Sequence, residues 1–122
     1  MIFLGIDYGS AKIGLAKASS ETGIATPFCI LKNDLTFETA LHDIINDEAV
    51  DEIIVGHPLN LSGKPSDQTR EVEAFADRIR LQFGKTVHLQ DERFSTKSAV
   101  AGKQGDDSSA AALMLQTFLD AQ

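Results

Sequence analysis

The chain has 122 residues, of which 43% are hydrophobic and 24% charged, as in an ordinary globular protein. This length fits one domain covering residues 1–122. No hydrophobic run approaches the ~20 residues that cross a bilayer, and the N-terminus does not resemble a signal peptide, so we expect a cytoplasmic protein with no membrane partner. The net charge of −7 argues against tight duplex binding through a basic surface. It leaves open an active site whose carboxylates bind phosphate through divalent cations.

The sequence of the N-terminal third of the chain predicts three strands. Residues 2–7 and 13–18 are apolar runs joined by a short turn, so they should form a hairpin. A third strand at 24–31 contains Pro27, which favours an edge position because proline donates no ladder hydrogen bond.

Helices and strands alternate along the rest of the chain. Apolar residues from Phe37 to Ile45 recur at helical spacing, and a second helical pattern spans 72–83. Between and after them lie predicted strands at 52–56 and 86–90. A short helix over 95–101 and a last helix from about residue 107 complete the pattern. The order predicts an α/β fold in which an antiparallel meander and two parallel βαβ units form a five-stranded mixed sheet, flanked by helices, with the first strand at its centre.

Polar residues gather at one edge of this predicted sheet. Asp7 ends the first strand, His57 follows the fourth and Glu92 follows the fifth. In α/β sheets, ligands bind beyond the carboxyl ends of the strands. Two carboxylates at neighbouring strand ends repel each other unless a cation joins them. The pattern therefore predicts a cation site at this edge.

A third acid precedes the last helix. Asp107 either caps that helix, as Asp often does, or projects toward Asp7 and Glu92. Three carboxylates suit one or two Mg²⁺ or Mn²⁺ ions, which support phosphodiester hydrolysis. The three histidines lack metal-ligand spacing with Cys29, so zinc is not expected, and no dinucleotide or P-loop glycine motif occurs.

Four blocks of the sequence resemble, in order, the signature blocks of the YqgF/RuvX family. They are FLGIDYGSAKIGLA, IIVGHPLNLSGKPSDQT, LQDERFST and DDSSAAALMLQTFLD. The resemblance covers almost the whole chain. It implies an RNase H-like fold, similar to the Holliday-junction resolvase RuvC. It also implies a bacterial nuclease that takes part in 5′-end maturation of pre-16S rRNA. An older proposal for the family is Holliday-junction resolution.

The resemblance also implies roles for individual residues. The catalytic and metal-binding acids would be Asp7, Glu92 and Asp107, with Asp106 in place of Asp107 if the register differs by one. The expected substrate contacts are Lys12, Asn60, Arg93 and Thr96. The chain departs from the family between DERFST and DDSSAA, where only KSAVAGKQG (97–105) replaces a longer helix and basic linker.

Two classes of function follow. The first is a metal-dependent nuclease acting as a monomer or homodimer on structured RNA or branched DNA. The second is an RNase H-like module that binds a nucleic acid or a partner without cutting it, which the acidic charge and the shortened segment favour. The motif D-x-G-S also occurs in the phosphate loops of two-lobed ATPases. We do not expect that function, because this chain has room for one lobe only.

Overall fold

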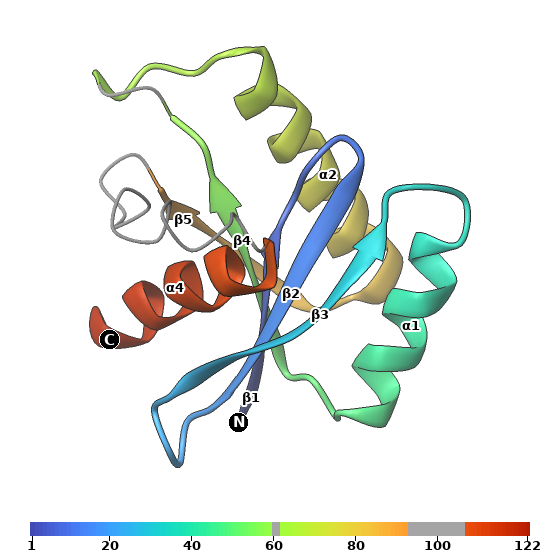
Figure 1. Ribbon diagram of the computed structural model, residues 1–122, viewed down its shortest axis with the longest axis vertical. Helices are drawn as coiled ribbons and strands as arrows, with labels where there is room; N and C mark the ends of the chain where they lie inside the picture. The colour runs from blue at the N-terminus through green and yellow to red at the C-terminus, as the bar shows by residue number, and fades with distance from the viewer. Residues whose placement is uncertain (60–61, 93–106) are drawn as a thin grey trace.

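A computed structural model describes residues 1–59, 62–92 and 107–122, with the backbone alone at Asp107. Five strands form one sheet in the order β3-β2-β1-β4-β5 (Figure 1). β1 pairs antiparallel with β2 and parallel with β4, which confirms the predicted mixed sheet with the first strand at its centre. The elements are β1 (Ile2–Asp7), β2 (Lys12–Ser19), β3 (Ala25–Lys32), α1 (Phe37–Asp47), β4 (Glu52–His57), α2 (Asp67–Phe83), β5 (Thr86–Asp91) and α4 (Asp107–Asp120).

Helices cover both faces of the sheet. α1 and α2 lie on one face and α4 on the other (Figure 1). Alternate residues of each strand point to opposite faces, so two hydrophobic clusters result. On the α1/α2 face the cluster includes Leu4, Ile6 and Phe75. On the α4 face it includes Phe3 and Leu115.

The backbones of β1 and α4 approach each other closely at Gly5. A Cβ added at Gly5 would lie 3.0 Å from Leu115 Cβ and 3.3 Å from the Ala111 carbonyl oxygen. Further along, Phe3 packs edge-to-face on Phe118, with ring centroids 6.1 Å apart. Because Phe118 meets Phe3 and Ala111 meets Gly5, α4 runs antiparallel to β1, and its N-terminus points toward the end of β1 that carries Asp7.

The edge position expected for the third strand is confirmed. β3 contains Pro27, and its pairing with β2 shifts register between Leu15 and Ala16, as at a β-bulge. Cys29 is half-buried in this strand, and burial raises the pKa of its thiol.

The last helix is confirmed. α4 begins at Asp107, directly after residues that the structure does not describe. The short helix expected over 95–101 lies outside the described residues. No helix in the described part of the chain is long and apolar enough to cross a membrane.

We expect Gly5→Val to destabilise the protein by about 1–3 kcal/mol, because added bulk must separate β1 from α4. Urea unfolding measures the change. Ala25→Val is the control, since Ala25 borders an open groove between β3 and α4 on the same face of the sheet. Equal unfolding midpoints for the two variants would contradict the close approach at Gly5.

Candidate functional site

Asp7 and Glu92 lie on the same face of the sheet. Phe3 and Gly5 of β1 face α4. Alternate residues of a strand point to the same side, so Asp7 also faces α4. Both carboxylate residues are half-buried. The sheet thus brings together two of the predicted acids, on the side covered by α4.

The Glu92 carboxylate lies directly over Gly56 of β4. A Cβ added at Gly56 would lie 2.5 Å from both Glu92 Cδ and Oε2, so no residue with a side chain fits there unless Glu92 moves. The paired register between β1 and β4 ends at Ile6 and Val55, and its next step places Asp7 beside Gly56. The Asp7 backbone is therefore about one strand spacing, ~5 Å, from the glycine that the Glu92 carboxylate covers.

The backbone of Glu92 is fixed as well. Its amide donates a hydrogen bond of 3.1 Å to the His57 carbonyl oxygen at the end of β4. The carboxyl ends of β4 and β5 therefore stay together beyond their last paired residues, His57 and Asp91. This bond holds Glu92 beside Asp7 after the strand itself has ended.

The third predicted acid lies at the start of α4. The helix begins at Asp107, one turn before Ala111, at the end of the sheet that carries Asp7. The side chain of Asp107 is not among those described, and no group of three His, Cys, Asp or Glu side chains that could hold a metal occurs among the described ones. Asp106, Asn60, Arg93 and Thr96 also lie outside the described residues.

The donors that are described suit a hard divalent cation. Carboxylate oxygens are the ligands that Mg²⁺ and Mn²⁺ prefer, and the missing side chain at Gly56 leaves space for the Glu92 carboxylate beside Asp7. Asp7 and Glu92 therefore fit the metal that the sequence suggests.

The turn between β1 and β2 brings Lys12 to the same end of the sheet. Lys12 is exposed and begins β2, two residues before Gly14, the register partner of Asp7. The turn is tight, since a Cβ added at Gly9 would lie 2.5 Å from the Lys12 carbonyl oxygen. Asn33 holds the turn from β3, because its side-chain amide donates to the Gly9 carbonyl oxygen at 2.9 Å and its backbone amide to Ala11 at 3.0 Å.

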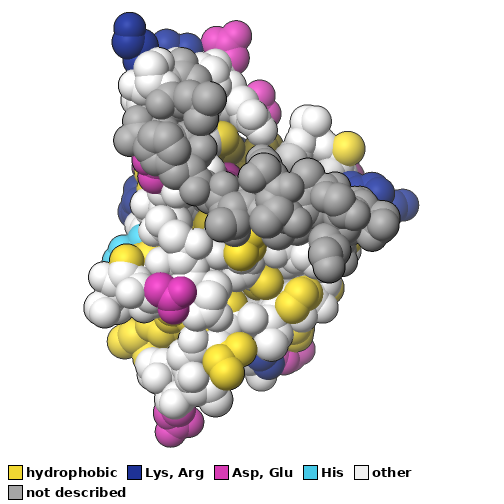
Figure 2. Space-filling model, turned by 60° about the vertical axis from the view of Figure 1, so that its left-hand side comes forward, with side chains coloured by type: hydrophobic (Ala, Val, Ile, Leu, Met, Phe, Trp, Pro, Cys, Tyr) yellow, Lys and Arg dark blue, Asp and Glu magenta, His cyan; other side chains and the backbone are white. Residues whose placement is uncertain are grey.

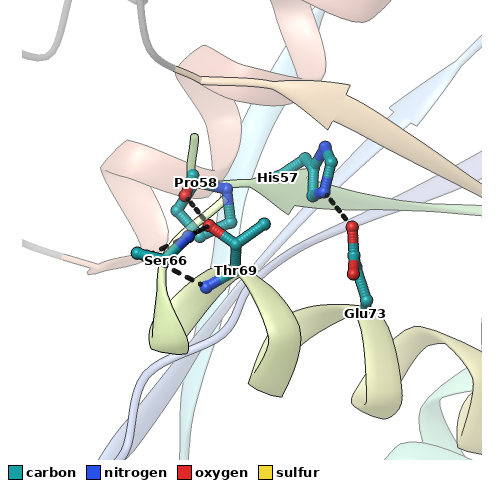
Figure 3. Close-up of polar contacts among 5 residues, drawn as sticks. All are labelled: His57, Pro58, Ser66, Thr69 and Glu73. Carbon is teal, nitrogen blue, oxygen red and sulfur yellow. Dashed lines mark hydrogen bonds and ion pairs between the residues drawn. The ribbon is translucent and has the colours of Figure 1, made fainter. Parts of the chain in front are cut away.

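The loop from β4 to α2 is held by a polar cluster that the sequence analysis missed (Figure 3). Thr69, fully buried, donates through its hydroxyl to the Pro58 carbonyl oxygen at 2.5 Å. Ser66 caps α2 by accepting from the Thr69 amide, and its own amide donates to the Thr69 hydroxyl. Gly63, in the same loop, has φ 81° and so needs a residue without a side chain. A serine before a helical run is a capping signal in the sequence, but the bond to Pro58 is visible only in the fold.

His57 belongs to this α2-side cluster. Its Nε2 lies 2.8 Å from Glu73 Oε2 on α2, and Figure 3 shows the ring turned toward that helix. Since His57 and Gly56 are consecutive strand residues, the imidazole points away from the face where Glu92 covers Gly56. His57 thus contributes its carbonyl oxygen to the site and its ring to the packing of α2.

Comparison with known sequences identifies the family. A family model described as RuvX, Holliday junction resolvase, matches residues 1–121. The chain belongs to the RuvX family. This confirms the resemblance found in the sequence.

Curated relatives of this RuvX-family chain match it over almost its whole length. One from Pseudomonas savastanoi pv. phaseolicola, provisionally named a pre-16S rRNA nuclease, is 38% identical over 133 residues, covering 98% of this chain and 91% of the relative. One from Rickettsia africae with the same name is 35% identical, covering 96% and 84%.

Solved structures confirm the RNase H-like fold. Thermus thermophilus RuvC in complex with a Holliday junction substrate has a TM-score of 0.63 at 14% identity, covering 99% of this chain and 94% of that one. A Fowlpox virus resolvase with Holliday junction DNA has a TM-score of 0.56 at 10% identity, covering 99% and 98%. Likeness at this identity concerns the fold alone.

We expect Thr69→Val to destabilise the protein by about 1–3 kcal/mol, because it leaves the Pro58 carbonyl and the Ser66 amide without their buried partner. Thr117→Val on the exposed side of α4 is the matched control. Chemical denaturation of both variants tests this, and a Thr69 variant as stable as the Thr117 variant would contradict a structural role for the cluster.

We expect Gly56→Ala and Glu92→Ala to be coupled. Alone, Gly56→Ala must displace the Glu92 carboxylate, whereas in a Glu92→Ala background the three atoms nearest to the added methyl group are gone. A double-mutant cycle on unfolding free energies should give an interaction of about 0.5–3 kcal/mol. Additive effects would show that the carboxylate does not occupy the space over Gly56.

Proposed function

We propose that this RuvX-family chain is a single-domain endonuclease that hydrolyses phosphodiester bonds with the help of divalent metal ions, in 5′-end processing of pre-16S rRNA. The observation that carries the proposal is the position of the Glu92 carboxylate over Gly56. Gly56 lies on β4, the strand beside Asp7, and the carboxylate is on the same face of the sheet as Asp7. The names of the curated relatives support RNA as the substrate. Bacterial ribosome assembly would place the protein in the cytoplasm.

Asp7 and Glu92, with Asp107 as the third acid, would hold one or two Mg²⁺ or Mn²⁺ ions. When bound, such ions lower the pKa of a coordinated water and stabilise charge on the oxygens of the reacting phosphate. The chain's own part is to hold the two carboxylates on either side of the end of β4: Asp7 ends the adjacent strand β1, and the Glu92 amide is hydrogen-bonded to the His57 carbonyl oxygen. The N-terminus of α4 faces the same end of the sheet, and its peptide dipoles favour negative charge there.

The proposed substrate contacts are Lys12, Asn60, Arg93 and Thr96. Lys12 is exposed at the end of the sheet that carries Asp7, where it would reach a phosphate group. Arg93 directly follows Glu92, so a contact from it would lie close to the reacting phosphate. The short segment 97–105 leaves fewer residues to cover a substrate than the family pattern would supply.

Branched DNA is the second candidate substrate. The family description names Holliday junction resolution, which requires symmetric cleavage and so a homodimer. A non-catalytic binding module is the third candidate. Parallel cleavage assays on a pre-16S leader RNA and a four-way DNA junction separate these candidates, because the module would bind without cutting either.

We expect Asp7→Asn to lower Mn²⁺-dependent cleavage of a pre-16S leader RNA by at least about 100-fold, since it removes a proposed metal ligand. The matched control is Asp77→Asn, at an exposed acid of α2 that pairs only with Arg80 among the described residues. Single-turnover cleavage rates provide the measurement. Equal rates for the Asp7 and Asp77 variants would refute the assigned site.

A further inference from the structure

Two exposed lysines lie opposite each other at the end of the sheet that carries Asp7. Lys12 begins β2, Lys32 ends β3, and the two are register partners. Neither forms an ion pair with a residue in the described part of the chain. Like charges directly opposite on neighbouring strands are destabilising, so this pair has a cost that the fold itself does not explain.

Both lysines face the side of the sheet where the acids lie. On β2, Ala16 and Ala18 pack in the α4-side cluster, and Lys12 shares their alternation. On β3, Cys29 and Leu31 pack against the opposite cluster, so Lys32 points toward the α4 side. Asp7, Lys12 and Lys32 therefore lie on one face, at one end, on three consecutive strands.

Four other basic residues of the described structure are paired with acids. Lys17, Arg70, Arg78 and Arg80 each form an ion pair with an acid. With the α4 side turned forward, Figure 2 shows basic side chains mostly toward the margins of the view. A cationic pair is thus a local feature of an acidic chain.

A nearby acid does not neutralise Lys32. The Asp34 carboxylate accepts hydrogen bonds from the Thr36 hydroxyl and amide. These bonds from Thr36 chiefly lower the pKa of Asp34, and Lys32 adds a weaker effect. No ion pair joins Lys32 to Asp34 within the described structure, so the ammonium group is available to a ligand.

The backbone beneath the two lysines is cross-linked by hydrogen bonds. Asn33, next to Lys32, donates to the carbonyl oxygens of Gly9 and Ala11 in the turn that precedes Lys12. These two bonds join the end of β3 to the turn after Asp7. Strand spacings of ~4.8 Å and ~3.4 Å per residue place the Cα atoms of the lysines on the order of 8 and 12 Å from that of Asp7.

We propose that Lys12 and Lys32 together bind a phosphodiester group of the substrate strand next to the one at the acids, and that Lys32 is a substrate-binding residue. The inference rests on the proposed function for the identity of the strand. A phosphate between the two ammonium groups removes their repulsion. It also directs the nucleic acid across β1, β2 and β3 toward Asp7.

The test measures binding of a fluorescent pre-16S leader RNA to the full chain between 50 and 200 mM KCl, with Ca²⁺ as the divalent ion. We expect Lys32→Gln to weaken binding by about three- to tenfold and to reduce the slope of log K against log salt by about 0.7–0.9. Lys32→Arg should keep the wild-type slope. Lys85→Gln is the control, because Lys85 also lacks an ion pair with any described residue but precedes β5 at the opposite end of the sheet.

The outcomes separate this inference from the proposed function. If wild type cuts the RNA in Mn²⁺ but Lys32→Gln binds with the wild-type slope, the phosphate site is wrong and the nuclease stands. If Lys32→Gln reduces the slope while wild type cuts neither the RNA nor a four-way DNA junction, the phosphate site stands and the nuclease is wrong. Wild type that binds neither nucleic acid would overturn both.

Discussion

The closeness of the Glu92 carboxylate to the backbone of β4 is the constraint on which the site depends. In this position the carboxylate leaves no room for a side chain at position 56, and it depends on β4 staying paired with β1 on one side and β5 on the other. The same face has a second glycine, Gly5, where α4 approaches β1. Glycine thus occurs at the two places where another group contacts the sheet backbone. At Gly56 that group is the Glu92 carboxylate, and at Gly5 it is α4, whose start lies toward Asp7.

The two faces of the sheet have different tasks. On the α1/α2 face, Thr69 holds the loop after β4 through Pro58, and Glu73 holds the ring of His57. These contacts fix the end of β4 from behind. The His57 carbonyl oxygen then accepts from the Glu92 amide. Polar groups on the far face therefore determine the position of an acid on the near face, although none of their side chains points into the site.

The sequence predicted what depends on local pattern. Short apolar runs located the five strands of the described sheet, helical periodicity located α1, α2 and α4, and polar residues after apolar runs located Asp7 and Glu92. It could not predict why Gly56 is glycine or that Lys32 faces Lys12, since both follow from the register between strands far apart in the chain. Asp107 was expected either as a helix cap or as a ligand because helix boundaries are poorly determined by sequence. The structure places its backbone in the first turn of α4, near the end of β1.

The acidic charge of the chain and a nucleic-acid substrate are compatible because the charges are placed unevenly. Lys17, Arg70, Arg78 and Arg80 pair with acids away from the site, so they add little to a long-range attraction for phosphate. A net charge of −7 then weakens binding to any duplex that touches the surface at large. Binding must come from a few contacts near the acids, and a strand that reaches Lys12 and Lys32 is also aligned with Asp7. With the proposed phosphate site, the general repulsion would disfavour unaligned nucleic acid more than aligned nucleic acid, so the acidic surface would increase selectivity for the strand that enters the site.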